Sequence, residues 1–254
     1  MDNQDVLIQR DGTIATVKLN RVGRHNSLVP SFLQALVDAF STLGADDSVS
    51  VIKLTSAAKS FSTGGDLLAF YEHRENPEPY AQEIVGLLNQ TIIAMIECPK
   101  PIVAVVNGQV TGGSMGLVLG SDIVLVSERA SFTPYYVEVG FSPDGGWSTL
   151  LNDVIGYQRA KVIQLLNKAI SADDALSWGL AFEKIYSAEI DAASAALCES
   201  LSSKKGKTLA STKRMARYPD YQQRLDAELQ AFCQLVVTED AQQGLKDFLD
   251  GLKQ

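Results

Sequence analysis

The strongest fold signal in this sequence is the stretch Val106-Asn107-Gly108-Gln109-Val110-Thr111-Gly112-Gly113-Ser114-Met115-Gly116. The apolar, β-branched run over 102–106 predicts a buried strand, and the apolar run over 114–120 predicts a short helix. A turn between a strand and a helix directs unpaired backbone N–H groups, supported by the helix dipole, at whatever lies in front of it. Its glycines also let the backbone approach a ligand closely. The stretch is therefore typical of a site that holds developing negative charge.

A second glycine turn lies upstream, in Ser60-Phe61-Ser62-Thr63-Gly64-Gly65-Asp66-Leu67. Enolate chemistry on a thioester places negative charge on the carbonyl oxygen, and two preorganised N–H groups can stabilise it. Losing one such donor typically costs about 3 kcal/mol. Either turn alone is equally typical of an ordinary strand-to-helix connection, whereas the pair favours an oxyanion hole.

Strand and helix patterns alternate in the first part of the chain. The periodicity predicts strands over 13–19, 50–55, 102–106 and 122–126, and helices over 31–43 and 81–97. Such alternation predicts an α/β fold with parallel strands and crossover helices. The polar segment 74–80, which contains two prolines, predicts a loop.

The chain after Trp147 has mostly helical patterns, which include 191–203, 208–217 and 222–252. Isolated helices need packing to be stable, and subunit contacts are one source of it. We therefore expect an α/β core over residues 1–190 and a helical region over 191–254.

Composition limits the classes of partner. The chain has 254 residues, 46% hydrophobic and 20% charged, with a net charge of −8. This charge argues against a nucleic-acid or anionic-membrane partner, because both need basic surface. The sequence contains no run of about 18 apolar residues, so it predicts no membrane-spanning helix. The polar start of the chain and the wide spacing of Cys98, Cys198 and Cys233 favour reduced thiols in a cytoplasmic protein without a metal site.

One motif is a decoy. Gly112-Gly113-Ser114-Met115-Gly116 matches the G-x-S-x-G turn that holds the nucleophile of α/β-hydrolases. In that fold the catalytic histidine follows the serine. This chain has only His25 and His73, both before Ser114, so no downstream histidine could activate the hydroxyl.

Two acidic residues are candidates for proton transfer. Asp144 follows Pro143 and lies between Phe141 and Trp147, and a carboxylate desolvated among such groups has the raised pKa that proton transfer at carbon needs. An N-cap for a following helix explains the same aspartate equally simply. Glu138 is the second candidate.

A basic loop, Arg21-Val22-Gly23-Arg24-His25-Asn26-Ser27, precedes the first predicted helix, and Lys59 precedes the first glycine turn. Such cations could bind phosphate groups, or they could be ordinary surface charge.

These segments together resemble the crotonase, or enoyl-CoA hydratase/isomerase, superfamily. The resemblance spans about residues 5 to 250 and rests on four segments: Phe61-Ser62-Thr63-Gly64-Gly65-Asp66-Leu67, Pro99-Lys100-Pro101-Ile102-Val103-Ala104-Val105-Val106-Asn107-Gly108, Gly112-Gly113 with Asp122-Ile123, and Ser177-Trp178-Gly179-Leu180. It implies a ββα-repeat spiral core, a helical C-terminal trimerisation region, and a homotrimer or dimer of trimers.

The resemblance also implies an acyl-CoA thioester as ligand, with coenzyme A as part of the substrate and no separate cofactor. The N–H groups of Gly65 and Gly113 would form the oxyanion hole. Arg24, His25 and Asn26 would lie near the phosphates and adenine of coenzyme A. The other substrate-binding positions would be Lys59, Gly64, Asp66, Leu67, Asn89, Gly112, Tyr136 and Trp147.

Departures from the family pattern bear on the reaction. Hydratases of the family use two glutamates, whose positions are Gly116 and Tyr136 here, so the usual addition of water is not expected. Asp144 falls where several isomerases carry an aspartate, and the surrounding run is most similar to the phenylacetate-pathway isomerase branch. The 4-chlorobenzoyl-CoA dehalogenase branch also has this aspartate, but its histidine and tryptophan would fall at Asn89 and Tyr136.

The sequence therefore predicts an enoyl-CoA isomerase with Asp144 as its single base. Two alternatives stay open. One is a hydratase or another crotonase reaction that recruits Glu138 or a bound water. The other is a protein that binds acyl-CoA without catalysis.

Overall fold

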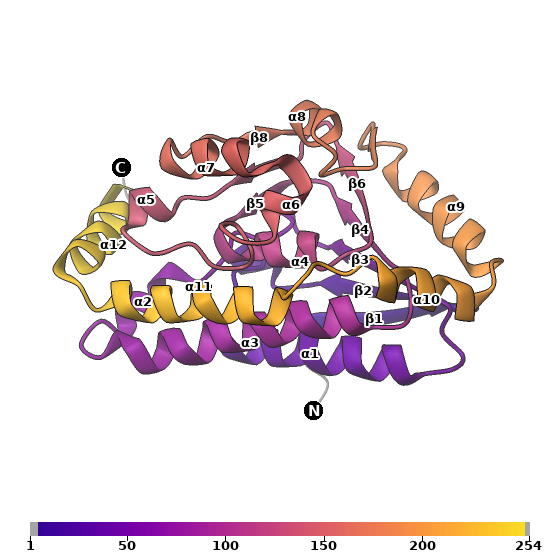
Figure 1. The fold of residues 1–254 in the computed structure, drawn as a ribbon, viewed down its shortest axis with the longest axis horizontal. Coiled ribbons are helices and arrows are strands. Elements are labelled where there is room, and N and C mark those ends of the chain that lie inside the picture. The colour runs from indigo at the N-terminus through magenta and orange to yellow at the C-terminus, as the bar shows by residue number, and fades with distance from the viewer. Residues whose placement is uncertain (1–4, 252–254) are drawn as a thin grey trace.

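The computed structural model describes residues 5–251, and its main sheet has six strands in the order β1-β2-β3-β4-β6-β9 (Figure 1). The strands are β1 (Val6–Asp11), β2 (Ile14–Leu19), β3 (Val51–Ser56), β4 (Ile102–Val106), β6 (Ile123–Ser127) and β9 (Glu183–Ile185). Only the β1–β2 pair is antiparallel. The predicted parallel strands are confirmed.

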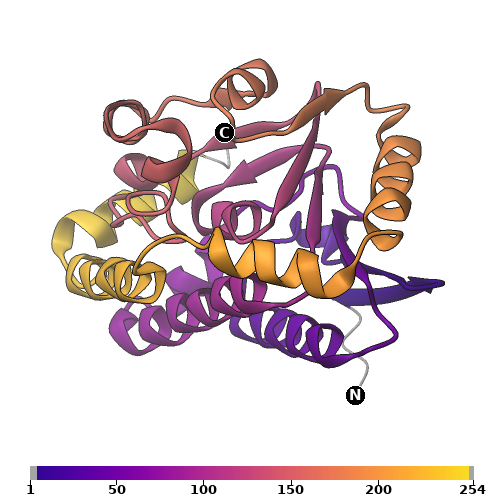
Figure 2. The ribbon, with the colours of Figure 1, turned by 45° about the vertical axis from the view of Figure 1, so that its right-hand side comes forward.

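Helices cover both faces of this sheet. The long helices α1 (Pro30–Ala45) and α3 (Pro77–Glu97) lie side by side on one face, and α9 (Ile190–Ser202) packs on the other (Figure 2). All five residues of β4 are buried as a result. A central parallel strand buried on both faces needs such a continuous apolar run.

A second, smaller sheet has the order β5-β7-β8, formed by β5 (Gln109–Thr111), β7 (Ser131–Thr133) and β8 (Ile170–Ser171). It begins at the glycine-rich stretch that follows β4. The short helices beside it are η2 (Gly112–Ser114), α4 (Met115–Leu119), α5 (Tyr136–Val139), α6 (Leu151–Ile155), α7 (Tyr157–Leu165) and α8 (Ala172–Ser177). The elements near the first glycine turn are η1 (Val22–Arg24) and α2 (Leu67–Glu72).

The C-terminal part is helical, as predicted, with α10 (Gly206–Met215), α11 (Tyr221–Val236) and α12 (Glu239–Gly251) after α9. Helix α11 packs along α3, and α12 packs against α5 and α2. Helix α12 therefore lies beside α5 and α2 (Figure 1), and its residues Phe248 and Leu249 line the same cavity as the glycine turns. Within residues 5–251, no helix has the length and apolar content to cross a membrane.

Three local predictions need correction. Helix α3 begins at Pro77, so most of the predicted loop over 74–80 is helical. Proline suits this first helical position because its missing N–H would have no partner there. The helix predicted over 222–252 is two helices, α11 and α12. Strand β1 was missed, although the Asp-Gly pair at 11–12 is a typical signal of the hairpin whose turn is Gly12-Thr13.

Candidate active site

The two glycine turns lie against each other. Ser62 and Val110 form a parallel bridge, and the Thr111 N–H donates to the Ser62 carbonyl at 3.1 Å. A Cβ atom at Gly64 would lie 2.5 Å from the Thr111 carbonyl oxygen, and Gly64 has a φ of +72°. Both the space and the backbone conformation therefore require glycine at this position.

Gly65 comes directly after Gly64 in the first turn, and Gly113 lies in the second turn. Both residues line one cavity of about 500 Å³. Gly113 is the second residue of η2, so its N–H lies in a first turn, where no preceding carbonyl of the helix can accept it. Among the loop and turn hydrogen bonds of residues 5–251, none has the N–H of Gly65 or Gly113 as donor. Two N–H groups free to bind a ligand oxygen are what an oxyanion hole needs.

Asp144 lies directly over Gly113. A Cβ atom at Gly113 would be 2.8 Å from Asp144 Oδ1 and 3.2 Å from Oδ2. The Asp144 side chain lines the cavity, and the residue is only 7% exposed. The Tyr136 hydroxyl donates to Asp144 Oδ1 and lies 3.1 Å from the Asp144 carbonyl oxygen. No helix N–H among the described residues donates to this carboxylate, so Asp144 is not an N-cap.

Burial raises the pKa of Asp144 from 3.8 to about 7. The hydrogen bond from Tyr136 lowers this pKa, because it stabilises the carboxylate, and the nearby Glu228 raises it. A carboxyl group that titrates near neutral pH can both accept and return a proton.

Glu228, which sequence reasoning missed, supports the loop that follows Asp144. It is buried on α11, and its carboxylate accepts hydrogen bonds from the N–H groups of Gly146 at 2.7 Å and Ser148 at 2.9 Å, and from the hydroxyls of Ser148 and Thr149. Burial raises the pKa of Glu228. No local pattern marks this glutamate, because its partners lie about eighty residues earlier in the chain.

Trp147 was predicted to bind substrate, and the structure places it behind the cavity. Its ring is fully buried outside the cavity lining, and its Nε1–H donates to the Gly112 carbonyl at 2.7 Å. This bond ties the Asp144 loop to the glycine turn. Tyr136, by contrast, lines the cavity as predicted for a residue near the substrate.

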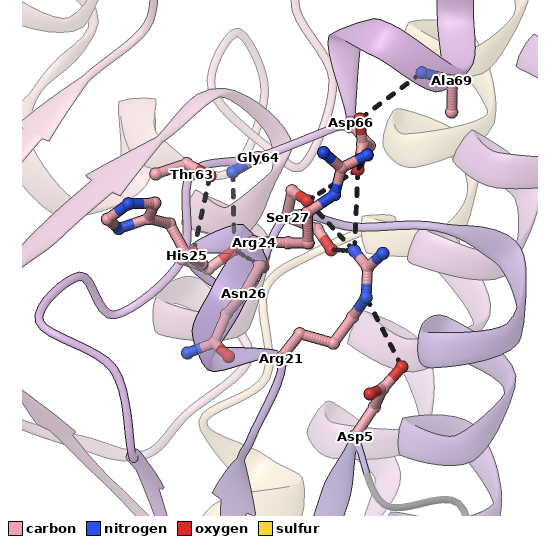
Figure 3. Close-up of polar contacts among 11 residues, drawn as sticks. Asp5, Arg21, Arg24, His25, Asn26, Ser27, Thr63, Gly64, Asp66 and Ala69 are labelled. Carbon is pink, nitrogen blue, oxygen red and sulfur yellow. Dashed lines mark hydrogen bonds and ion pairs between the residues drawn. The ribbon is translucent and has the colours of Figure 1, made fainter.

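Asp66 is the second carboxylate on the cavity, and it is held by neighbours. It caps α2 through the Ala69 N–H and accepts a hydrogen bond from Ser27 Oγ at 2.9 Å. The guanidinium nitrogens of Arg24 and Arg21 lie 3.5 and 3.8 Å from Asp66 Oδ2, the oxygen that also accepts from Ser27 (Figure 3). Asp66 therefore organises the basic loop, and Arg24, whose side chain is 53% exposed, lies at the cavity edge.

The remaining predicted binding residues divide into two groups. Arg24, His25, Asp66, Leu67 and Gly112 line the cavity, together with Gly65, Gly113, Tyr136 and Asp144. Gly64, Asn26, Asn89, Lys59 and Trp147 do not.

Two amide side chains in the second group have internal roles. Asn26 is fully buried and donates to Ser56 Oγ and the Phe61 carbonyl, which ties the basic loop to the first glycine turn. Asn89 is buried on α3 and donates to the Leu225 carbonyl of α11 at 3.0 Å. Neither residue is among those that line the cavity, and their contacts with a substrate stay predictions. Lys59 is exposed, and its contact with coenzyme A stays a prediction.

Ser114 and Glu138 do not have the geometry for catalysis. Ser114 is fully buried, and its hydroxyl donates to the carbonyls of Ser62 and Thr111. It therefore braces the two turns and is not a nucleophile. Glu138 is exposed and lies outside the cavity lining.

The cavity is apolar away from the glycine turns. Phe70, Phe141 and Phe232 pack against one another there, with ring centroids 5.2 to 5.8 Å apart. The other apolar residues of the lining are Leu28, Leu33, Leu67, Leu68, Ile84, Leu88, Val139, Phe248 and Leu249. Helices α11 and α12 thus supply part of this wall. No cluster of three or more His, Cys, Asp or Glu side chains within residues 5–251 could hold a metal ion.

Comparison with known proteins shows the family. A family model described as enoyl-CoA hydratase/isomerase matches residues 9–254. The crystal structure of an enoyl-CoA hydratase from Bacillus halodurans shares the fold, with a TM-score of 0.90 over 96% of this chain and 99% of that one at 23% identity. The predicted fold class, with its C-terminal helical region, is confirmed.

Three curated relatives differ in reaction. The trans-2-decenoyl-[acyl-carrier-protein] isomerase of Streptococcus mutans is 25% identical over 98% of this chain and 97% of that protein. The 1,2-epoxyphenylacetyl-CoA isomerase of Escherichia coli is 30% identical over 68% and 66%. The 4-chlorobenzoyl coenzyme A dehalogenase-2 of an Arthrobacter species is 31% identical, and the match spans 69% of this chain but only 64% of that protein.

Proposed function

This chain belongs to the enoyl-CoA hydratase/isomerase family, and from that premise we propose that it moves a double bond within an enoyl-CoA thioester. One observation carries the proposal: Asp144 is the carboxylate that lies against Gly113, and its pKa is raised to about 7. The other carboxylate on the cavity, Asp66, is already bound by Ser27 and two arginines.

The reaction proceeds through an enolate. The thioester oxygen accepts hydrogen bonds from the N–H groups of Gly65 and Gly113. The Asp144 carboxylate takes a proton from the carbon between the carbonyl and the alkene, so that C–H bond breaks and a carboxyl O–H bond forms. The electron pair spreads onto the thioester oxygen as a dienolate. Asp144 then returns the proton to the far carbon, and the double bond now lies next to the carbonyl.

The wall beyond Asp144 supports an apolar acyl group. It contains Phe70, Phe141 and Phe232 and no charged side chain. An apolar acyl tail gains free energy when it moves from water into this space, and it meets no unpaired charge there. Coenzyme A would extend toward Arg24 and His25 at the polar edge, as part of the substrate.

Both positions at which hydratases of the family carry a glutamate lack one here, which argues against the hydratase alternative. At Gly116 a Cβ atom would lie 2.8 Å from Ile92 Cγ1, so a glutamate here would require the Ile92 side chain to move. At Tyr136 the ring fills the corresponding side of the cavity.

Dehalogenation is the second candidate, because a relative with that activity is 31% identical. That reaction would use Asp144 as a nucleophile on an aromatic ring. We rank it lower because Asn89 stands at the position of the dehalogenase histidine, and its amide donates to the Leu225 carbonyl.

The first experiment is a proton NMR time course in deuterated buffer, with a cis-3-enoyl-CoA and, separately, a trans-2-enoyl-CoA. Migration of the double bond without a 3-hydroxy product is the expected result. A 3-hydroxyacyl product would contradict the isomerase proposal in favour of hydration. Chloride release from 4-chlorobenzoyl-CoA would favour the second candidate, and tight binding of all esters without turnover would favour a binding protein.

A further inference from the structure

Tyr136 occupies an unusual place beside the proposed base. It is the first residue of α5, follows Tyr135 in the left-handed region, and is only 6% exposed. Its hydroxyl donates to Asp144 Oδ1, and a Cβ atom at Gly112 would lie 3.9 Å from it. The phenol hydroxyl therefore contacts the proposed base and also lies near Gly112 of the second glycine turn.

The two oxygens of Asp144 are consequently not equivalent. Oδ1 accepts the hydrogen bond of the Tyr136 hydroxyl, whereas no side chain among the described residues donates to Oδ2. Both oxygens lie close to the second glycine turn, since a Cβ atom at Gly113 would be 2.8 Å from Oδ1 and 3.2 Å from Oδ2. Oδ2 is the one of the two that no neighbouring side chain binds, so it is the oxygen left to take up a proton.

We propose that Tyr136 is a positioning residue that limits this site to isomerisation: it binds Asp144 Oδ1, leaves Oδ2 to carry the proton, and fills the space that a reacting water would need. The proposal rests on the proposed function. It concerns the choice between two reactions that one enolate site can perform.

Water addition needs a water molecule that is bound to a base and lies next to the alkene. Its oxygen would bond to the carbon β to the thioester, its proton would pass to the base, and the α carbon would take a proton back from that carboxyl group. In this cavity the phenol ring and hydroxyl occupy the space beside Asp144 Oδ1. Isomerisation requires no water, and a single oxygen can remove and return the same proton.

The charged groups around Asp144 fix the direction of the pH effect. From α5 the Tyr136 hydroxyl lowers the pKa of Asp144, and from α11 the Glu228 carboxylate raises it. Arg24, His25 and Asp66 line the opposite, polar edge of the same cavity. Replacing Tyr136 with Phe removes the hydrogen bond that favours the carboxylate, so the pKa of Asp144 should rise.

Two variants test the two halves of the proposal. Tyr136→Phe keeps the ring and removes the hydroxyl, and Tyr136→Ala removes both. Tyr218→Phe is the matched control, because Tyr218 also has a buried hydroxyl, which donates to the Leu119 carbonyl outside the cavity.

The first readout does not depend on activity. The protein is labelled with aspartate enriched in ¹³C at the carboxyl carbon, and the Asp144 signal is identified by its loss in Asp144→Asn. In Tyr136→Phe the titration midpoint should move up by about one to two units, the effect expected of a lost hydrogen bond to a charged group. It should not move in Tyr218→Phe. An unchanged midpoint in Tyr136→Phe would overturn the positioning role.

The second readout is the product formed from a trans-2-enoyl-CoA. Tyr136→Ala should form 3-hydroxyacyl-CoA, which the wild-type protein and Tyr218→Phe should not form. If Tyr136→Ala folds and binds the ester but forms no 3-hydroxy product, exclusion of water by Tyr136 is wrong. Failure of the proposed function would look different, since the wild-type protein itself would then move no double bond while the carboxyl titration still reported on Tyr136.

Discussion

The proposed chemistry, at the scale of single residues, depends on one buried carboxyl group, that of Asp144. Desolvation penalises the charged form of Asp144, and the Tyr136 hydroxyl partly offsets that penalty. The residue therefore stays protonated in the folded protein at pH values where an ordinary aspartate is ionised. Activity and stability should respond to pH in opposite directions.

The first prediction concerns Asp144→Asn. Isomerase activity should fall by about 10²- to 10⁴-fold, the usual contribution of a general base. In the wild-type protein kcat/KM should rise with pH through about 7, because only the ionised carboxylate accepts a proton. A pH series of initial rates measures both effects, and an Asp144→Asn variant with full activity would rule out this base.

The same substitution should alter stability with a sign that follows from proton binding. Between the unfolded pKa of 3.8 and the folded pKa of about 7, the folded state binds more protons than the unfolded state. The free energy of unfolding should therefore fall as pH rises through this window, by at most about 4 kcal/mol from this group. Asp144→Asn should remove that part of the slope, which urea unfolding at pH 5 and pH 8 can measure.

The second prediction concerns the closeness of Gly113 to Asp144. In Gly113→Ala the new methyl group would lie 2.8 Å from both Asp144 Oδ1 and Leu88 Cδ2, so the carboxylate must move. Activity should fall by about 100-fold or more, since the N–H and the base would both be displaced. Gly86→Ala is the control, because nothing lies within 4 Å of a Cβ atom there. The control should keep its activity and gain about 1 kcal/mol of helix stability.

At the scale of secondary-structure elements, the C-terminal helices complete the site. Helix α11 brings Glu228 to the loop that carries Asp144 and Phe232 to the cavity wall. Helix α12 adds Phe248 and Leu249. The proposed base therefore belongs to a loop whose position depends on a helix far along the chain.

The third prediction tests that dependence. In the wild-type protein four hydrogen-bond donors face the Glu228 carboxylate. Glu228→Gln puts an amide NH2 among these donors, so the free energy of unfolding should fall by about 2 to 3 kcal/mol. Removing the charge should also lower the pKa of Asp144, so the kcat/KM profile should shift to lower pH. Asp226→Asn, on the exposed side of α11, should change neither quantity. A profile that stays in place in Glu228→Gln would contradict the electrostatic link.

The fourth prediction concerns Phe232, which is 2% exposed and packs on Phe70 and Phe141. Phe232→Ala enlarges the apolar end of the cavity, at a cost of about 3 to 5 kcal/mol in the free energy of unfolding. The acyl chain with the highest kcat/KM should become longer. Rates on a series of saturated-tail enoyl-CoA esters measure this, and an unchanged preference would mean that the tail ends elsewhere.

At the scale of the whole molecule, apolar side chains remain exposed around α7, α8 and β9. They include Leu165 and Leu166, which are 67% and 61% exposed, and Phe182 and Tyr186, which are 67% and 72% exposed. Exposed apolar groups gathered on neighbouring elements are typical of interaction surfaces. We propose that a second copy of the chain covers them in a homotrimer or dimer of trimers.

The fifth prediction follows from this surface. The double variant Leu165→Lys with Phe182→Lys should sediment as a smaller particle than the wild-type protein, because buried unpaired charges oppose association. Ile8→Lys, which also changes an exposed apolar residue but lies on β1, should leave the particle unchanged. A wild-type protein that sediments as a single chain would contradict the proposed assembly.

Local patterns in the sequence were sufficient to predict the parallel strands and the two glycine turns, and they indicated Asp144 as a candidate base. The buried run of β4 and the glycines at 64 and 113 are dictated by short-range packing and backbone conformation, which neighbouring residues express directly. The sequence alone also shows that positions 116 and 136 carry no glutamate, and this absence favoured isomerisation over the addition of water.

Only the tertiary structure showed which residues surround Asp144. The bond between Glu228 and Gly146, the turn of Asn89 toward Leu225, and the bond from Trp147 to Gly112 join segments that lie 35 to 136 residues apart. Periodicity describes one element at a time, so it cannot say which elements meet. The burial that raises the pKa of Asp144 arises from that meeting of elements, because desolvation depends on everything packed around the group.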